Sequence, residues 1–283
     1  MKTGLRAKQR RQLVLDIIGF LISCIILIPF LLVVINSLKS KRNANLLQLS
    51  LHGISLEQAS KNYKEVMESA RILTSFLNSL IATAGGAFVV LILASMTAFI
   101  LVRRKSKLSS LLNNFIIMGL TLPLAMVPIY FLLGKINMNT GNSAMIGAIL
   151  VYGASLFPFT FFVYTGFIKG ITQEIDEAAI IDGAGPVKLF FSIIFPLLKP
   201  VTVTALMNAV MTIWNDFSIS LYLLNSSKRT TAVLTTYLFV GQKSSDWQLL
   251  FADVVIVSMP VVILYLCMQK YIVAGLSDGA VKG

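Results

Sequence analysis

Residues 177–200 read EAAIIDGAGPVKLFFSIIFPLLKP, and they decide how the rest of the chain is interpreted. The stretch opens as a short polar helix, breaks at Gly183 and Gly185, and continues as an apolar helix that two prolines limit. Glycine permits backbone angles that end a helix, and Pro186 suits the first position of a new one. The stretch therefore predicts a helix–turn–helix elbow, which is typical of a docking element that receives mechanical work from a soluble partner at a membrane surface.

The first helix of this elbow carries signals of its own. Thr172 is expected to cap its start, and Glu174 and Asp176 then fall in the first turn, where acids suit the helix dipole. Glu177 lies beside a face on which residues recur at helical spacing, namely Ile175, Ala178, Ala179 and Asp182. The two small alanines allow another surface to approach closely, although an ordinary capped loop can use the same residue types.

The composition of the whole chain indicates a membrane protein. Of its 283 residues, 56% are hydrophobic and only 13% are charged, whereas a soluble domain carries about 25% charged residues. The net charge is +12, and the basic residues stand beside apolar runs, so we expect a membrane surface and lipid as partners rather than nucleic acid.

Six apolar runs predict membrane spans, since a span needs roughly 20 residues. They cover about residues 13–35, 79–102, 111–134, 143–168, 201–224 and 249–271. The first is expected to be an anchor, because it is longer than the apolar part of a signal peptide and no cleavage site follows it. Pro123 and Pro128 are expected to kink the third, and residues 189–200 to lie at the interface before the fifth. The predicted fold is an all-α integral membrane protein of six transmembrane helices, with a helix–turn–helix between spans four and five.

Basic residues also predict the orientation of these spans. A basic N-terminus at residues 1–12 and a cluster at residues 103–107 are separated by two crossings, so both are expected in the cytoplasm. Parity then places the elbow, at about 171–198, and the C-terminus on that side too. Lys39, Lys41 and Arg42 favour the opposite orientation. The chain is thus divided into the N-terminus, a first span at 13–35, an extracytoplasmic segment at 36–78 and a core at 79–283.

Two outer segments have recognisable features. Residues 55–58 have the S-x-x-Q form of a capping box, and apolar residues then recur at helical spacing, so we expect an amphipathic helix from Leu56 to Ser69. That helix suits a membrane face and a partner contact equally well. The loop at 225–248 is polar, with Lys228, Arg229 and Lys243, and either contacts a soluble partner or only connects two spans.

Several kinds of chemistry are not expected. The chain has no G-x-x-x-x-G-K-[ST] phosphate loop, so ATP hydrolysis would have to come from another subunit. With a single histidine, His52, and two cysteines inside apolar runs, Cys24 and Cys267, neither a metal site nor a disulfide framework is predicted. We therefore expect neither a catalytic residue nor a cofactor.

The fifth span offers candidates for a substrate path. Asp216 lies 16 residues after Pro200, roughly 24 Å along a helix, and an ionisable residue at such depth is a candidate functional site. With Trp214 and Asn215 it can meet sugar hydroxyls by stacking and hydrogen bonding. The alternative is structural, with Trp214 packed between helices and Asp216 capping a helix or pairing with a neighbouring span. Asp253, near the start of span six, is expected at the interface.

The elbow resembles the EAA loop in permease subunits of binding-protein-dependent ABC importers. The residues that match in type and spacing are Glu177, Ala178, Ala179, Gly183, Ile193 and Pro196. Flanking segments at 78–80, 181–185, 214–216 and 279–283 resemble the carbohydrate branch, the MalG-like subunits. Phe195 and Thr172 depart from it, standing where leucine and proline are common.

This resemblance implies a permease of a carbohydrate importer in a bacterial-type inner membrane. It implies partnership with a second, homologous permease, two cytoplasmic ATP-binding subunits and an extracytoplasmic sugar-binding protein. The implied ATPase-coupling residues are Glu177, Ala178, Ala179, Asp182, Gly183 and Gly185. An ion-coupled secondary transporter remains the alternative, although only Asp216 is a deep ionisable candidate for coupling. A non-transport membrane scaffold is a further alternative.

Overall fold

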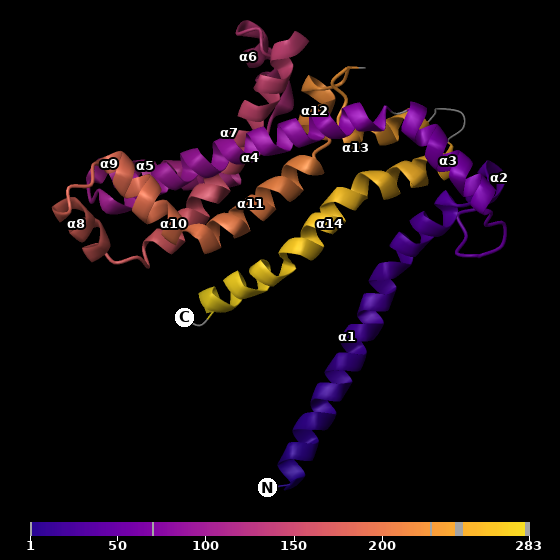
Figure 1. Cartoon of the computed structure of the whole chain (residues 1–283), viewed down its shortest axis with the longest axis horizontal. Coiled ribbons are helices and arrows are strands. Elements are labelled where there is room, and N and C mark those ends of the chain that lie inside the picture. Colours follow the sequence, from indigo (N-terminus) through magenta and orange to yellow (C-terminus); the bar gives the residue numbers. More distant parts are fainter. Residues whose placement is uncertain (1, 70, 227, 241–245, 281–283) are drawn as a thin grey trace. The chain divides into compact units, whose positions relative to one another are not determined.

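A computed structural model describes residues 2–69, 71–226, 228–240 and 246–280, most of which are helical (Figure 1). Lys243 and the last three residues of the C-terminal segment 279–283 lie outside the described residues. The elements in chain order are α1 (Lys2–Ser37), α2 (Lys41–Ala44), α3 (Leu56–Ser69), α4 (Ile72–Arg103), α5 (Lys107–Met118), η1 (Gly119–Thr121), α6 (Met126–Lys135), η2 (Gly141–Ser143), α7 (Ala144–Ile168), α8 (Glu174–Ile181), α9 (Pro186–Lys188), η3 (Leu189–Ile194), α10 (Phe195–Leu197), α11 (Lys199–Trp214), α12 (Ser218–Leu223), α13 (Ala232–Thr235), η4 (Thr236–Phe239) and α14 (Trp247–Ala280).

Four of the described helices are long and apolar enough to cross a membrane, at 12–37, 72–103, 141–168 and 247–267. Two bent helix pairs raise the number of candidate spans to as many as six. The first pair joins 107–121 to 126–135 at 120°, and the second joins 186–197 to 199–214 at 79°. The all-α membrane fold is therefore confirmed, with the expected third and fifth spans bent or broken.

The break in the third apolar run is sharper than the predicted kink. Residue Leu122 is extended, with φ −85° and ψ 123°, and α6 starts only at Met126. Pro123 explains this break, because proline pushes the preceding residue out of helical angles and has no N–H to donate. Pro128 lies in the first turn of α6, where a proline is tolerated.

The predicted fifth span at 201–224 is not one continuous helix, because α11 ends at Trp214 and α12 starts at Ser218. The bend before α11 falls between Leu197 and Lys199, close to where the sequence placed the change from interface to crossing. Pro200 lies in the first turn of α11 and cannot donate a hydrogen bond to the preceding helix.

The chain forms two compact units, one of residues 1–72 and 235–259, the other of residues 73–234 and 260–283. In the first unit, α3 has the predicted bounds and buries Ala59, Asn62 and Val66. The Asn62 amide donates to the carbonyl oxygens of Ser37 at 2.8 Å and Lys39 at 2.9 Å. These buried hydrogen bonds fix α3 to the turn after α1.

The capping box of α3 forms only in part, and its apolar stripe is not fully buried. The Gln58 N–H donates to Ser55 Oγ at 3.4 Å, but the Gln58 side chain donates to Asn62 Oδ1 instead of returning to Ser55. Leu56 is 87% exposed. The buried stripe therefore starts one turn later than the sequence predicts.

The basic residues after α1, which opposed the predicted orientation, have structural partners. Lys39 is buried, and its ammonium group donates to the Gln48 carbonyl at 2.8 Å and to Asn36 Oδ1 at 3.2 Å. Lys41 forms an ion pair with Asp246 at 2.5 Å. Two of the three residues thus serve the packing of the first unit, which weakens them as topology signals.

Asp253, which the sequence analysis expected at the membrane interface, is fully buried among protein side chains of the first unit. The Thr235 hydroxyl is 2.9 and 3.0 Å from its two carboxylate oxygens. A buried carboxylate needs such a hydrogen-bond partner, and Thr235 supplies it from α13.

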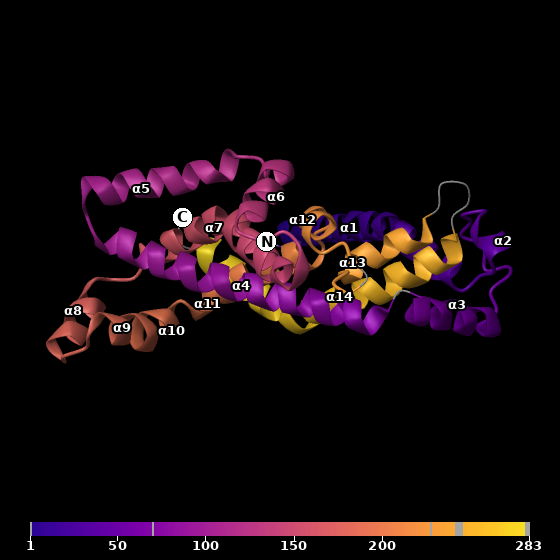
Figure 2. The ribbon, with the colours of Figure 1, turned by 90° about the horizontal axis from the view of Figure 1, so that it is seen from above.

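In the second unit, α4 lies beside α7 and α11, and α8 lies near one end of α4 (Figure 2). Small residues allow the close approach: a side chain on Gly86 would meet Tyr152 and Ile213, and one on Gly153 would meet Val89. Buried alanines of α4 face the same core. Close packing over small residues is the usual way that membrane helices associate. The elbow is therefore attached to helices that are packed against one another.

Candidate docking elbow and polar helix break

The elbow turns at Gly183. Its φ of +79° is a left-handed angle that glycine adopts without strain. The Gly183 N–H donates to the Ile180 carbonyl at 3.0 Å, and the Ala184 N–H to the Ala179 carbonyl at 2.9 Å. This pair of bonds is a Schellman motif, which satisfies carbonyls at a helix end. Pro186 then starts α9, as predicted.

Gly185 has a different place in the turn. Its φ is −69° and its ψ is 165°, angles that any residue adopts. A side chain built on it would meet no atom within 4 Å. Of the two glycines that the sequence singled out, only Gly183 is required by the backbone.

The start of α8 differs from the prediction. The N-cap is Gln173, which makes no side-chain cap bond, so Thr172 is not the cap. Glu174, Asp176 and Glu177 do occupy the first turn. The cap interaction is replaced by an ion pair from another helix.

That ion pair joins Arg103, the last residue of α4, to Asp176 of α8. Arg103 Nε donates to Asp176 Oδ2 at 2.6 Å, and Nη2 donates to Oδ1 at 3.3 Å. The Arg103 guanidinium also donates to the carbonyls of Ile171 at 3.1 Å and Thr172 at 3.5 Å. The side chains are only 14% and 11% exposed, so this two-pronged contact clamps the base of the elbow.

The sequence did not reveal this pair. Arg103 served as a topology signal and Asp176 as an acid suited to the helix dipole. They are 73 residues apart, and no local pattern links residues at that separation.

The faces of α8 divide the predicted coupling residues. Ala179 is buried and packs with the second arm of the elbow, the apolar helical segment at 186–198. Glu177 and Ala178 are exposed. Adjacent residues point about 100° apart around a helix, which is why the two alanines do not share one surface. Asp182, Gly183 and Gly185 are also exposed.

An apolar tip stands next to these residues, with Ile180 60%, Ile181 85% and Val187 71% exposed. Exposed aliphatic side chains gathered at a turn are typical of an interaction site. The sequence analysis did not single out this tip, although three aliphatic residues within eight positions of a polar turn were visible in it.

The second arm of the elbow is anchored in the core. Leu189, Phe190, Ile194 and Leu198 are buried there, and the Phe190 ring lies 5.7 Å from that of Phe99 on α4. The π-helical turn at η3 lets this apolar face follow the core. Both arms therefore attach to α4, one by charge and one by packing.

The break between α11 and α12 holds the candidate path residues. Trp214 is 7% exposed, and its ring packs edge-on against Phe76 at 5.7 Å. Asp216 Oδ2 accepts from the Tyr152 hydroxyl at 2.9 Å and from the Ser220 N–H at 3.0 Å. These contacts are the structural alternative that the sequence had left open: Trp214 packs, and Asp216 both caps α12 and bonds to α7.

Asn215 is the exposed member of the three. Its side-chain amide donates to the Met211 carbonyl at 2.8 Å, and the residue is exposed. The described part of the chain contains no group of three His, Cys, Asp or Glu residues able to hold a metal ion.

The amino-acid sequence is similar to those of known membrane transport proteins. The family described as "Binding-protein-dependent transport system inner membrane component" matches residues 90–278. The melibiose/raffinose/stachyose import permease protein MelC of Bacillus subtilis (strain 168) is 34% identical over 280 residues, covering 98% of this chain and 99% of MelC. The multiple sugar-binding transport system permease protein MsmG of Streptococcus mutans serotype c is 33% identical, covering 91% of this chain and 92% of MsmG.

A solved structure gives the same fold. A chain in the crystal structure of a bacterial ABC transporter involved in the import of the acidic polysaccharide alginate matches with a TM-score of 0.78 and 19% identity, over 94% of this chain and 98% of that chain. In such systems the membrane subunit is not the ATPase, which is a separate subunit, and a binding protein is a further partner. The chain is therefore a multi-pass inner membrane permease, and it belongs to the family of binding-protein-dependent transport system inner membrane components.

Proposed function

We propose that this permease imports an oligosaccharide and that its elbow transmits the motion of an ATPase subunit to the membrane helices. The substrate class is supported by two relatives, the melibiose/raffinose/stachyose import permease MelC and the multiple sugar-binding transport system permease MsmG. The coupling role is supported above all by one observation: α8 exposes an apolar tip while both arms of the elbow are fixed to α4.

Rigid attachment is what such a role requires. A push on Ile180 and Ile181 passes through α8 to Asp176 and Arg103, and so reaches the end of α4. The second arm carries the same push through Phe190 to Phe99. Glu177, Ala178 and Asp182 surround the tip and contact the ATPase surface in this proposal. A flexible loop would change its own conformation under such a push and would not move the membrane helices.

The assembly follows from the elbow. One chain presents one such elbow, and ATP-driven closure brings two ATPase subunits together, so a second, homologous permease supplies the other elbow and the other half of the path. The elbow and both chain termini face the cytoplasm in this proposal, because the basic N-terminus and the 103–107 cluster favour that side. Asn215, beside the Asp216 carboxylate, is the residue we place on the sugar path.

Replacing Glu177 tests the coupling role. Glu177→Lys reverses an exposed charge beside the tip and is expected to lower co-purification of the ATPase subunits at least tenfold. Glu65→Lys, the same change on the exposed side of α3, is the matched control and should retain them. Full co-purification and full sugar-stimulated ATP hydrolysis in Glu177→Lys would rule out ATPase contact at this surface.

A further inference from the structure

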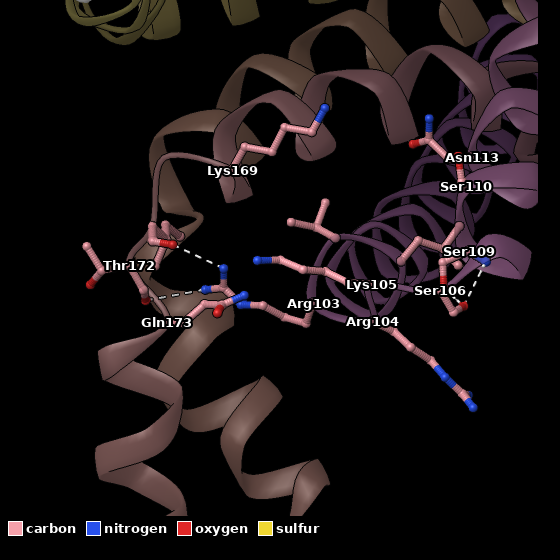
Figure 3. A pocket seen from close by; sticks show the side chains of 13 residues that line it. Arg103, Arg104, Lys105, Ser106, Ser109, Ser110, Asn113, Lys169, Thr172 and Gln173 are labelled. Carbon is pink, nitrogen blue, oxygen red and sulfur yellow. Dashed lines mark hydrogen bonds between the residues drawn. The ribbon is translucent and has the colours of Figure 1, made fainter.

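A cavity of about 590 Å³ with both polar and apolar lining residues lies in the second unit, between the end of α4, the start of α5 and the connection from α7 to α8 (Figure 3). Three of its lining residues are basic, namely Arg104, Lys105 and Lys169, besides the clamped Arg103. Hydroxyl and amide groups of Ser106, Ser110 and Asn113 complete the opposite wall. None of the described residues that line this cavity is acidic.

The charge of the cavity is not compensated by the protein. Arg103 is committed to Asp176, but among the described residues neither Lys105 nor Lys169 has an ion-pair partner. In Figure 3 the Lys105 side chain extends toward Thr172 and the Lys169 side chain extends toward the side of Asn113, whereas Arg104 extends away from Lys169. Ammonium groups facing hydroxyl and amide donors form a site for an oxyanion, of which phosphate is the commonest biological example.

A second observation concerns α5, which contributes Ser110 and Asn113 to the cavity. An apolar groove of about 410 Å³ runs along the C-terminal half of α5, lined by Phe115, Ile116, Met118 and Thr121 and by Phe157 and Pro158 of α7. Asn113 of the 590 Å³ cavity and Ile116 of the groove are three residues apart, so they lie on one face of α5. A polar, basic end is thus followed along one helix by an apolar groove.

We propose that this face of α5 binds an anionic phospholipid, with the phosphate between Lys105 and Lys169 and an acyl chain in the apolar groove. A soluble phosphate compound would use only the cavity, and the groove would stay without an occupant. Basic residues here also act as topology signals, but a topology signal requires neither a cavity nor a groove beside it. Basic pockets between membrane helices on the cytoplasmic side are suited to such head groups.

The site adjoins the elbow. Thr172 and Gln173, which lead into α8, form part of the cavity wall. A bound head group therefore touches the base of the elbow, next to the clamp at Arg103. The lipid assignment itself does not depend on which sugar is carried or on what the elbow contacts.

Lipid retention tests the head-group contact. The intact transporter, purified from its native membrane, is reconstituted with phosphatidylglycerol and phosphatidylcholine, and its retained lipids are counted by native mass spectrometry. Lys105→Gln combined with Lys169→Gln is expected to weaken phosphatidylglycerol retention about 25-fold, or about fivefold per lysine. Lys107→Gln combined with Lys199→Gln removes the same charge from exposed positions that do not line the cavity, and should retain the lipid. Equal retention by the two double variants, or equal retention of the two lipids by the unaltered protein, overturns the proposal.

A second pair of variants tests the acyl chain. Thr121→Phe fills the groove, whereas Leu120→Phe adds the same ring to an exposed residue that does not line it. Only Thr121→Phe should lower retention of phosphatidylglycerol, with both lysines intact. If inorganic phosphate or glycerol phosphate displaces the lipid from the cavity and Thr121→Phe has no effect, the site is one for a soluble phosphate and the lipid assignment is wrong. Cross-linking of a cysteine at position 169 to the second permease would equally show that a protein surface fills the cavity.

Discussion

Gly183 and Gly185 are both glycines, but their backbone conformations differ. Only Gly183 has a left-handed φ, where an L-residue costs about 1–2 kcal/mol. Gly183→Ala is therefore expected to strain the turn, displace α8 and lower sugar-stimulated ATP hydrolysis by the assembled transporter severalfold. Gly185→Ala, at a φ of −69° and in open space, should behave as the unaltered protein. Equal effects of the two substitutions would contradict this account of the turn.

The contact between Arg103 and Asp176 is a second residue-scale feature. Asp176→Ala leaves a guanidinium that is only 14% exposed without its partner, which we expect to destabilise the elbow by about 3 kcal/mol. The readout is the rate of limited proteolysis near residues 171–173. Glu174→Ala removes an acid from the same turn that makes no described ion pair, and is the control.

A double-mutant cycle separates the pair from other effects. Arg103→Ala combined with Asp176→Ala should cost clearly less than the sum of the two single substitutions, since the ion pair between them can be lost only once. Additive losses would mean that the two residues act independently and that the clamp does not hold the elbow.

At the scale of elements, the joint between α11 and α12 depends on one side chain from α7. Tyr152→Phe removes the hydroxyl that donates to Asp216 and is expected to cost about 2 kcal/mol, because hydrogen bonds to charged groups contribute more than neutral ones. The melting temperature in detergent measures this loss. Tyr222→Phe, on an exposed tyrosine of α12, should leave it unchanged.

The same joint separates a structural role from a role in the sugar path. Asn215→Ala changes an exposed amide and should raise the apparent KM for sugar without lowering the melting temperature. The Tyr152→Phe variant should do the reverse. A raised KM in Tyr152→Phe together with unchanged stability would mean that Asp216 contacts the substrate directly.

At the scale of the whole molecule, the orientation in the membrane is open to direct measurement. After replacement of Cys24 and Cys267 by serine, single cysteines are placed at exposed positions 64 on α3 and 188 in the elbow. A membrane-impermeant maleimide should label position 64 in intact spheroplasts and position 188 only after permeabilisation. The opposite pattern would place the elbow outside, where no ATPase could reach it.

The amino-acid sequence by itself determined the features that depend on neighbouring residues. Apolar run length predicts helices that cross a membrane, and a glycine followed by proline predicts the turn of the elbow, since both rest on hydrogen bonds and side chains only a few positions apart. The bounds of α3 followed from the same local rules. These features include the motif that carried the family resemblance.

Only the tertiary structure decided which distant groups meet. Arg103 reaches Asp176 across 73 positions, and Tyr152 reaches Asp216 across 64. Packing also turned Ala179 inward and left Ala178 exposed, and it converted an ionisable residue of the fifth run into the cap of a helix break. Such outcomes depend on which helix ends lie side by side, and charge pairs or buried hydrogen bonds form wherever the fold leaves a polar group away from water.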